Sequence, residues 1–375
     1  MRFGQSFEYG LRGCRPSATL TDLLAMSPTL EFRDPPEAIV DADGHVALGA
    51  YRRPFRHANL EQARITLGRI PLGRVGSRLV LKEWQHVAII LPEAMLTYAI
   101  VDAKYVKTSW CHFVNRDGTG QFEHARKGLR LRVARDLWNA TTQVRAHGYR
   151  IHVHNHLDVG EHTIRIHIHN DGRAPSVEAE LRCMHDLERN PPLEVVMPVG
   201  PGRAMYSHKV SLPIEGTLKV GQRVIDVCAD EARAIWDVHK AHYPHRTWWN
   251  WATFAGKDDQ GRTVALNLTR NINRRDDEIN ENAVWLDGAL QRLGPARFTH
   301  DPFRSLEPWK IGTADGAVDL SFRPLGERRE NLRLGLIRSV FHQPFGVFSG
   351  TIHAHGQMVR IDDAWGICED HDALW

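Results

Sequence analysis

Long apolar runs are missing from this sequence. The densest apolar segment, Val87–Leu91, ends at Pro92, and no stretch approaches the roughly 20 apolar residues that a helix needs to cross a bilayer. Residues 1–16 also lack the apolar segment of a secretory signal. We therefore expect a protein without a transmembrane segment, and contact with a membrane surface stays open.

Cysteine is scarce and widely spaced. The five cysteines are Cys14, Cys111, Cys183, Cys228 and Cys368, and no two of them form a CxxC pair. An odd number of distant thiols argues against a disulfide framework and against a zinc ribbon. The pattern is typical of reduced thiols, so we expect a cytoplasmic protein.

Charge of one sign is not in excess. The sequence has 48 Lys and Arg against 45 Asp and Glu, for a net charge of +3. A nucleic-acid partner needs a concentrated basic face, so we expect none. The sequence also has no GxGxxG, Walker A, HExxH, GxSxG or EF-hand motif. We therefore expect no cofactor.

Short segments rich in β-branched and aromatic residues follow one another from Arg78 onward. Strand pairs are predicted around the turns at residues 116–120 and 256–261, and residues 151–154 should form a hairpin with residues 164–169. Further strands are predicted at residues 96–102, 105–115, 121–125, 283–286, 318–322, 332–340, 346–353 and 358–361. Such frequent strands, without β-α-β alternation, predict antiparallel sandwiches or barrels.

Helical spacing is rare, and the length suits two domains. Short helices are predicted near Thr21–Ala25 and at Asp230–His239, which begins with two acidic residues. The Pro- and Gly-rich segment near residue 200 marks a boundary. We predict a β domain at residues 1–200, with an irregular N-terminal segment, and a second β domain at residues 201–375 that carries the candidate site.

Tryptophan and asparagine concentrate in residues 237–288. On a strand, Trp249 and Trp251 share one face, and Asn250 lies on the other. Tryptophan beside asparagine, with Arg246 nearby, suits a cavity that is mostly apolar and has a few fixed polar groups. The alternative is that these tryptophans fill the core.

Two carboxylates in this region are candidate catalytic groups. Glu281 stands between two asparagines, of which Asn282 precedes a predicted strand, and Asn267 belongs to the strand before. Burial there would raise the pKa of Glu281 and make it a general acid or base. Asp237 is the second candidate. The alternative for the Glu281 segment is a polar turn that begins a strand.

Histidines alternate along the hairpin predicted at residues 151–169. His152 and His154 share one face of the first strand, and His167 and His169 share one face of the second. Paired in a hairpin, the two rows are candidate metal ligands around an open coordination position. The alternative is a solvated outer face opposite an Ile/Val core face.

Several short motifs occur together in one order. They are His208-Lys209, Arg246–Trp251, Asn267-Leu268, Asn280–Ala283, Gln343–Gly346 and Glu369–His371. In this combination the sequence resembles the bacterial domain of unknown function 2804 family over nearly the whole chain. That pattern is in turn similar to the paired lipocalin-like barrels of carotenoid hydratases and lipid-handling stress proteins. The resemblance implies a mainly β fold with two tandem antiparallel lipocalin-like barrels or sandwiches and few short helices.

Three functions stay open. The first is binding and transformation of an apolar small molecule, lipid or isoprenoid-like, in a Trp-lined cavity by cofactor-free acid/base chemistry through Glu281 or Asp237. The second is non-catalytic lipid binding or transport, and the third is a metal- or carbohydrate-processing enzyme. The ligand contacts expected for the first function are Arg246, Trp249, Asn250, Trp251, Asn267, Asn282 and Gln343.

Overall fold

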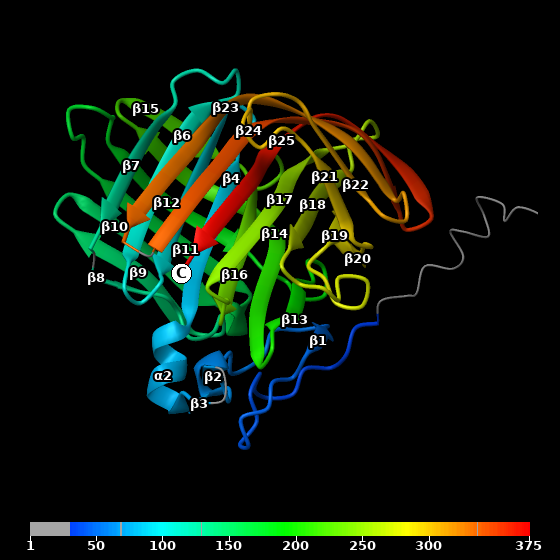
Figure 1. Ribbon diagram of the computed structural model, residues 1–375. Helices are drawn as coiled ribbons and strands as arrows, with labels where there is room; N and C mark the ends of the chain where they lie inside the picture. Colours follow the sequence, from blue (N-terminus) through cyan, green and yellow to red (C-terminus); the bar gives the residue numbers. More distant parts are fainter. Residues whose placement is uncertain (1–30, 68–69, 129, 336) are drawn as a thin grey trace, which may run out of the picture.

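Two large antiparallel sheets make up most of the protein (Figure 1). The computed structural model describes residues 31–67, 70–128, 130–335 and 337–375. Within these residues the strands form a 14-stranded sheet, a 9-stranded sheet and a small 2-stranded sheet. Both large sheets are curled into half-barrels. The predicted fold class, mainly β with tandem antiparallel barrel-like units and few short helices, is confirmed.

The first sheet is built around two central strands. It contains β1 (Gly49–Tyr51), β4 (Lys82–Ile90), β5 (Ala94–Asp102), β6 (Lys107–Asn115), β7 (Phe122–Lys127), β8 (Arg130–Arg132), β9 (Ala140–Ala146), β10 (Tyr149–His156), β11 (Glu161–Ile168), β12 (Val177–Met184), β13 (Leu193–Gly200), β14 (Arg203–Val220), β15 (Arg223–Val227) and β16 (Arg233–Ala241). Its main order is β7-β6-β5-β4-β16-β14-β12-β11-β10-β9-β8. β14 and β16 therefore join two meanders that precede them in the sequence.

The second sheet has the C-terminal strand of the protein at its centre. It contains β17 (Arg246–Lys257), β18 (Thr263–Asn271), β19 (Ala283–Leu286), β20 (Ala289–Arg292), β21 (Ala296–Thr299), β22 (Trp309–Thr313), β23 (Val318–Leu334), β24 (Ile337–Ala354) and β25 (Gln357–Leu374). Its order is β20-β19-β18-β17-β25-β24-β23-β22-β21. The end of the chain thus lies between β17 and β24 in the middle of the sheet.

Helices are short in the described residues, and one predicted helix is wrong. The elements outside the large sheets are η1 (Leu60–Gln62), β2 (Thr66–Leu67), β3 (Ile70–Pro71), α2 (Gly73–Val80) and η2 (Leu157–Val159). The helix predicted at Asp230–His239 is instead the strand β16, which is buried between β4 and β14. A strand covered on both faces has no polar alternation, so its apolar spacing does not distinguish it from a helix. The turn predicted near Thr21–Ala25 lies outside the described residues.

Most predicted strands are present, and one range is divided. The hairpins β6–β7, β10–β11 and β17–β18 lie where the turn signals predict them. The single strand predicted at residues 332–340 is wrong, because a turn with Gly335 at φ 58° separates β23 from β24 within that range. No helix in the described part of the chain is long and apolar enough to span a membrane.

The change from one sheet to the other comes later than the boundary expected near residue 200. The Pro-rich segment there contains β13, which pairs with β14, and both β14 and β16 belong to the first sheet. The second sheet begins at Arg246. The division into two folding domains stays a prediction.

The buried residues form a core inside each sheet and a third core between the sheets. The first packs inside the first sheet and includes Trp236, and the second packs inside the second sheet and includes Trp309. The third combines residues of β4, β14 and β16 with residues of β17, β18 and β25, including Trp251 and Trp365. The two sheets are therefore packed face to face through an apolar layer.

Candidate functional site

A cavity of about 160 Å³ lies between the two sheets. Its lining comes from both sheets and includes the half-exposed Tyr105, so the cavity reaches the molecular surface. Near this opening, β23 is tied to β7 of the first sheet. Arg328 lies 2.8 Å from Glu123, and Lys127 lies 2.6 Å from Glu330.

The first sheet contributes two neighbouring cross-strand rows to the cavity. One row runs through Trp110, Ala99, His86, Asp237 and Lys209. The other runs through Thr108, Val101, Trp84, His239 and Ser207. Since alternate residues of a strand face the same side, β16 presents both Asp237 and His239 to the cavity.

The second sheet contributes two rows of its own. Thr269, Trp251 and Glu369 stand side by side on β18, β17 and β25. Next to them are Asn271, Trp249 and His371, followed by Phe341 on β24. The predicted shared face of Trp249 and Trp251 is therefore the cavity face.

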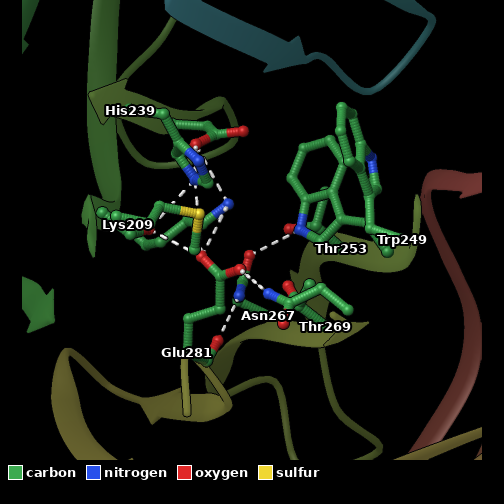
Figure 2. A network of polar contacts seen from close by, with 12 residues as sticks. Lys209, His239, Trp249, Thr253, Asn267, Thr269 and Glu281 are labelled. Atoms are coloured by element: carbon green, nitrogen blue, oxygen red, sulfur yellow. Dashed lines mark hydrogen bonds and ion pairs between the residues drawn. The ribbon is translucent and has the colours of Figure 1, made fainter. Parts of the chain in front are cut away.

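Four ionisable side chains of the cavity lining form a cluster, Lys209, Asp237, His239 and Glu281, and Figure 2 shows three of them, Lys209, His239 and Glu281. Lys209 Nζ lies 3.0 Å from Asp237 Oδ1 and 3.6 Å from Glu281 Oε2. His239 Nε2 lies 2.9 Å and 3.4 Å from the same two oxygens. The Ser207 hydroxyl donates a hydrogen bond of 2.7 Å to Glu281. The two predicted catalytic carboxylates thus share the same two cationic partners.

The charges of this cluster stabilise one another. Burial opposes every charge, but the neighbouring cations hold the pKa values of Asp237 and Glu281 below their ordinary values. In the same way, the carboxylates raise the pKa values of Lys209 and His239 against the effect of burial. The expectation that burial raises the pKa of Glu281 is therefore wrong in its net direction. Glu281 is therefore a carboxylate at neutral pH.

Glu369 faces the same cavity in a different electrical environment. Burial raises the pKa of its carboxyl to about 7, although hydrogen bonds from Trp249 Nε1 at 2.8 Å and Gln343 Nε2 at 2.7 Å act in the opposite direction. Its two protein donors are uncharged, so little compensates the loss of water around a negative charge. Glu369 therefore holds its proton up to a pH near neutral and is suited to donate it.

Aromatic rings form the wall between these two acidic groups. The Trp84 ring stacks on His239 at 4.6 Å and on Trp249 at 5.8 Å between centroids. Tyr243 extends the stack, with Trp249 at 6.1 Å and Trp375 at 6.0 Å. On the other side, Lys209 Nζ lies 4.8 Å from the centroid of Trp251. A wall of this kind favours an apolar or conjugated ligand.

Several predicted ligand contacts do not line the cavity. Arg246 is exposed and pairs with Asp372, and the side-chain amide of Asn250 bonds with His300 and Asp370. Both side chains lie outside the cavity lining, so neither orients a ligand within it. Alternation along β17 explains this, because Trp249 and Trp251 point to one side of the strand, while Arg246 and Asn250 point to the other.

Three other predicted contacts support the cavity walls from behind. Asn267 accepts a hydrogen bond of 2.7 Å from Trp251 Nε1 and donates one of 2.5 Å to the Glu281 carbonyl (Figure 2). Asn282 accepts a bond of 2.7 Å from the backbone N–H of Thr269. Gln343 holds Glu369, as described above. These amides position the rings and carboxyls that face the cavity.

The predicted histidine rows do not converge on a common centre. The hairpin is present, but its register places Arg165 opposite His152 and Arg150 opposite His167. Among the described residues no group of three or more His, Cys, Asp or Glu side chains could hold a metal ion. The rows occupy the outer face, while Ile and Val residues of both strands face the core. The histidine rows therefore agree with the alternative interpretation, a solvated outer face opposite an Ile/Val core face.

Sequence patterns missed several residues of the cavity. Lys209 and Glu369 belong to the motifs noted above, and His239 ends the helix predicted at Asp230–His239, but none of the three was singled out as a site residue. Reading Asp230–His239 as a helix concealed that Asp237 and His239 share one face. His86 and Trp84 show the alternation of a strand, yet only the pairing of β4 with β16 brings them to the cluster.

The comparisons with known proteins concern the family and the fold. Residues 31–375 match the family described as "Domain of unknown function (DUF2804)". No curated protein matches the sequence. The solved structure of CghA with Sch210972 is similar, with a TM-score of 0.50 and 11% identity, over 77% of this chain and 87% of that chain.

Two further solved structures have TM-scores of 0.42. A protein assigned as AttH from Nitrosomonas europaea is 15% identical over 77% of this chain and 91% of its own. Kievitone hydratase from Nectria haematococca is 12% identical over 77% of this chain and 88% of its own. At these identities the likeness concerns the fold.

Proposed function

The chain belongs to the domain of unknown function 2804 family, and from its cavity we propose that it binds a largely apolar small molecule and transforms it by acid/base chemistry. One observation carries the proposal. Two kinds of carboxyl group face one aromatic cavity, and their surroundings move their pKa values in opposite directions. Such a divergence is how proteins assign acid and base roles to similar groups.

In this proposal Glu369 donates a proton and Glu281 accepts one. Asp237 is the alternative base, because it shares Lys209 and His239 with Glu281. Trp249 and Trp251 bind the ligand, and their π faces stabilise positive charge that develops on it. A lipid or isoprenoid-like molecule suits the apolar walls. A cytoplasmic location, expected from the cysteine pattern, belongs to the same proposal.

The experiment uses the purified chain and an apolar extract of the cells that produce it. Both are incubated in D2O, and mass spectrometry then follows new products and deuterium incorporated at carbon. Proton transfer to carbon labels the product whatever the net reaction is. We expect turnover with the unchanged protein and a loss of at least about 100-fold in Glu369→Gln and in Glu281→Gln, the range of a missing acid or base.

The matched control is Asp370→Asn. Asp370 follows Glu369 directly and its pKa is also raised, chiefly by burial, but it lies outside the cavity lining. This variant should turn over normally. Compounds that bind without conversion would indicate the carrier function instead. If native mass spectrometry finds no apolar compound bound at all, the proposal is wrong.

A further inference from the structure

His86 is a buried polar side chain without a partner. It lies on β4, faces the cavity and is 4% exposed. Neither of its ring nitrogens has a hydrogen-bond partner among the described residues. Buried polar groups are nearly always paired, so an unpaired imidazole that lines a cavity points to a partner within that cavity.

The surroundings of His86 define what that partner can be. The rings of Trp110 and Trp251 lie 5.4 Å and 5.5 Å from its own centroid, so the partner sits among aromatic faces. Asp237 is its neighbour on β16, but that carboxylate is engaged by Lys209 and His239. Both ring nitrogens of His86 are therefore free of hydrogen bonds to the described protein residues and can bond to a ligand.

A second unpaired group lies close by. The Thr269 hydroxyl lines the cavity beside Trp251 on the neighbouring strand and has no hydrogen-bond partner among the residues described. His86 therefore lies on one side of Trp251, with Thr269 next to it on the other sheet. Both groups can donate and accept hydrogen bonds.

The charged groups around His86 already face partners of opposite charge. Lys209 and His239 face Asp237 and Glu281, and Arg328 pairs with Glu123 and Glu330. Burial lowers the pKa of His86 to about 4, so its ring is neutral and offers one donor and one acceptor. An ionic ligand group would need a further counter-charge in this buried site, whereas an uncharged group needs none. An uncharged oxygen meets these conditions.

We infer that the cavity selects an uncharged apolar molecule that carries a hydroxyl or carbonyl oxygen, and that this oxygen hydrogen-bonds to His86 beside the Trp251 ring. The inference rests on the proposed function and narrows its substrate class. Pure hydrocarbons and fatty-acid anions lie outside this class. His86 is thereby a residue that determines specificity.

The test compares two probes that differ by one oxygen, 2-naphthol and naphthalene. Their binding is measured by quenching of the tryptophan fluorescence of the full chain. We expect the unchanged protein to prefer 2-naphthol by about tenfold, the factor that one well-placed hydrogen bond supplies. In His86→Phe the two probes should bind within about twofold of each other.

His112→Phe is the matched control. His112 is also buried on the first sheet, and burial lowers its pKa to about 4 as well, but it does not line the cavity. This variant should keep the preference for 2-naphthol. If His86→Phe keeps it too, or if the unchanged protein shows no preference, the inference is wrong while apolar binding stands.

The outcome for the proposed function is separate. If neither probe binds the unchanged protein, apolar binding itself fails, and the inference fails with it. Should His86→Phe not fold, the unchanged protein still decides through ¹⁵N NMR of the His86 ring. We expect 2-naphthol to shift its ring-nitrogen resonances and naphthalene to leave them in place. Equal responses to both probes would contradict the inference.

Discussion

Glu281 and Glu369 face the same cavity but lie in opposite electrical surroundings. Glu281 is placed against Lys209 and His239, which offset the loss of hydration around a negative charge. Within the part of the chain that the structure describes, the side-chain donors to Glu369 are the uncharged Trp249 and Gln343. One group is therefore stable as an anion and the other as a neutral acid. Because the two groups prefer different protonation states, they give the free energy of unfolding different dependences on pH.

We predict that Glu369 destabilises the folded protein as the pH rises. Its pKa is raised from 4.5 to about 7, so the folded state binds its proton more tightly than the unfolded state. The resulting stabilisation is complete below about pH 4.5 and is lost as the pH passes through 7. Between pH 5 and pH 8 the unchanged protein should lose on the order of 2 kcal/mol relative to Glu369→Gln. Urea unfolding at several pH values measures this difference.

The control for this pH effect is Asp370→Asn. Because Asp370 is only partly buried, its substitution should alter the pH profile much less. A free energy of unfolding that falls equally in the unchanged protein and in Glu369→Gln would show that Glu369 is ionised when folded. It would then be unsuited to the role of proton donor.

Among the elements, β24 depends on close backbone packing. Gly346 pairs with Pro324 on β23 and with Gly366 on β25. A Cβ atom at residue 346 would overlap the backbone of β23 at Arg323 and Pro324. Gly346 ends the motif Gln343–Gly346, and the close approach of β23 leaves no room for a side chain at this position.

We predict that Gly346→Ala lowers the free energy of unfolding by on the order of 2 to 4 kcal/mol, since the overlapping atoms belong to the backbone and cannot rotate away. Gly256→Ala is the matched control on β17. The nearest atom to its added Cβ would be Ala364 Cβ at 3.4 Å, an ordinary contact. That variant should stay within about 1 kcal/mol of the unchanged protein in urea unfolding. Equal effects would contradict the packing argument.

For the whole molecule, the charged cluster joins the two sheets. Lys209 belongs to β14 of the first sheet, while Glu281 precedes β19 of the second. Removing one member of a buried charged network leaves the others without compensation. We therefore expect the stability of each sheet to be coupled to that of the other, although each sheet also has a core of its own.

We predict that Lys209→Met lowers the free energy of unfolding by on the order of 3 kcal/mol and that both sheets still unfold together. Hydrogen exchange in β10–β11 and in β21–β22 reports on each sheet, and both should become faster. Lys219→Met is the control, because Lys219 lies on the same strand with a half-exposed side chain and a distant partner at 4.0 Å. Faster exchange in one sheet alone would indicate two independent domains.

The sequence by itself determined the strand content, most hairpins and the aromatic face of Trp249 and Trp251. These features depend on local alternation and turn residues, which neighbouring positions encode. The sequence also indicated Glu281 and Asp237 as candidate catalytic groups within residues 237–288. The family could be identified from the order of its short motifs, which extend over nearly the whole chain.

Only the tertiary structure decided the surroundings of these residues. β16 is a strand because it pairs with β4 along one edge and with β14 along the other. Its own sequence does not show this pairing, because a strand buried on both faces lacks polar alternation. The pKa directions of Glu281 and Glu369 depend on Lys209, His239 and Gln343, which come from distant positions in the chain. Electrostatic effects act through space and burial, so residues far apart in sequence set them together.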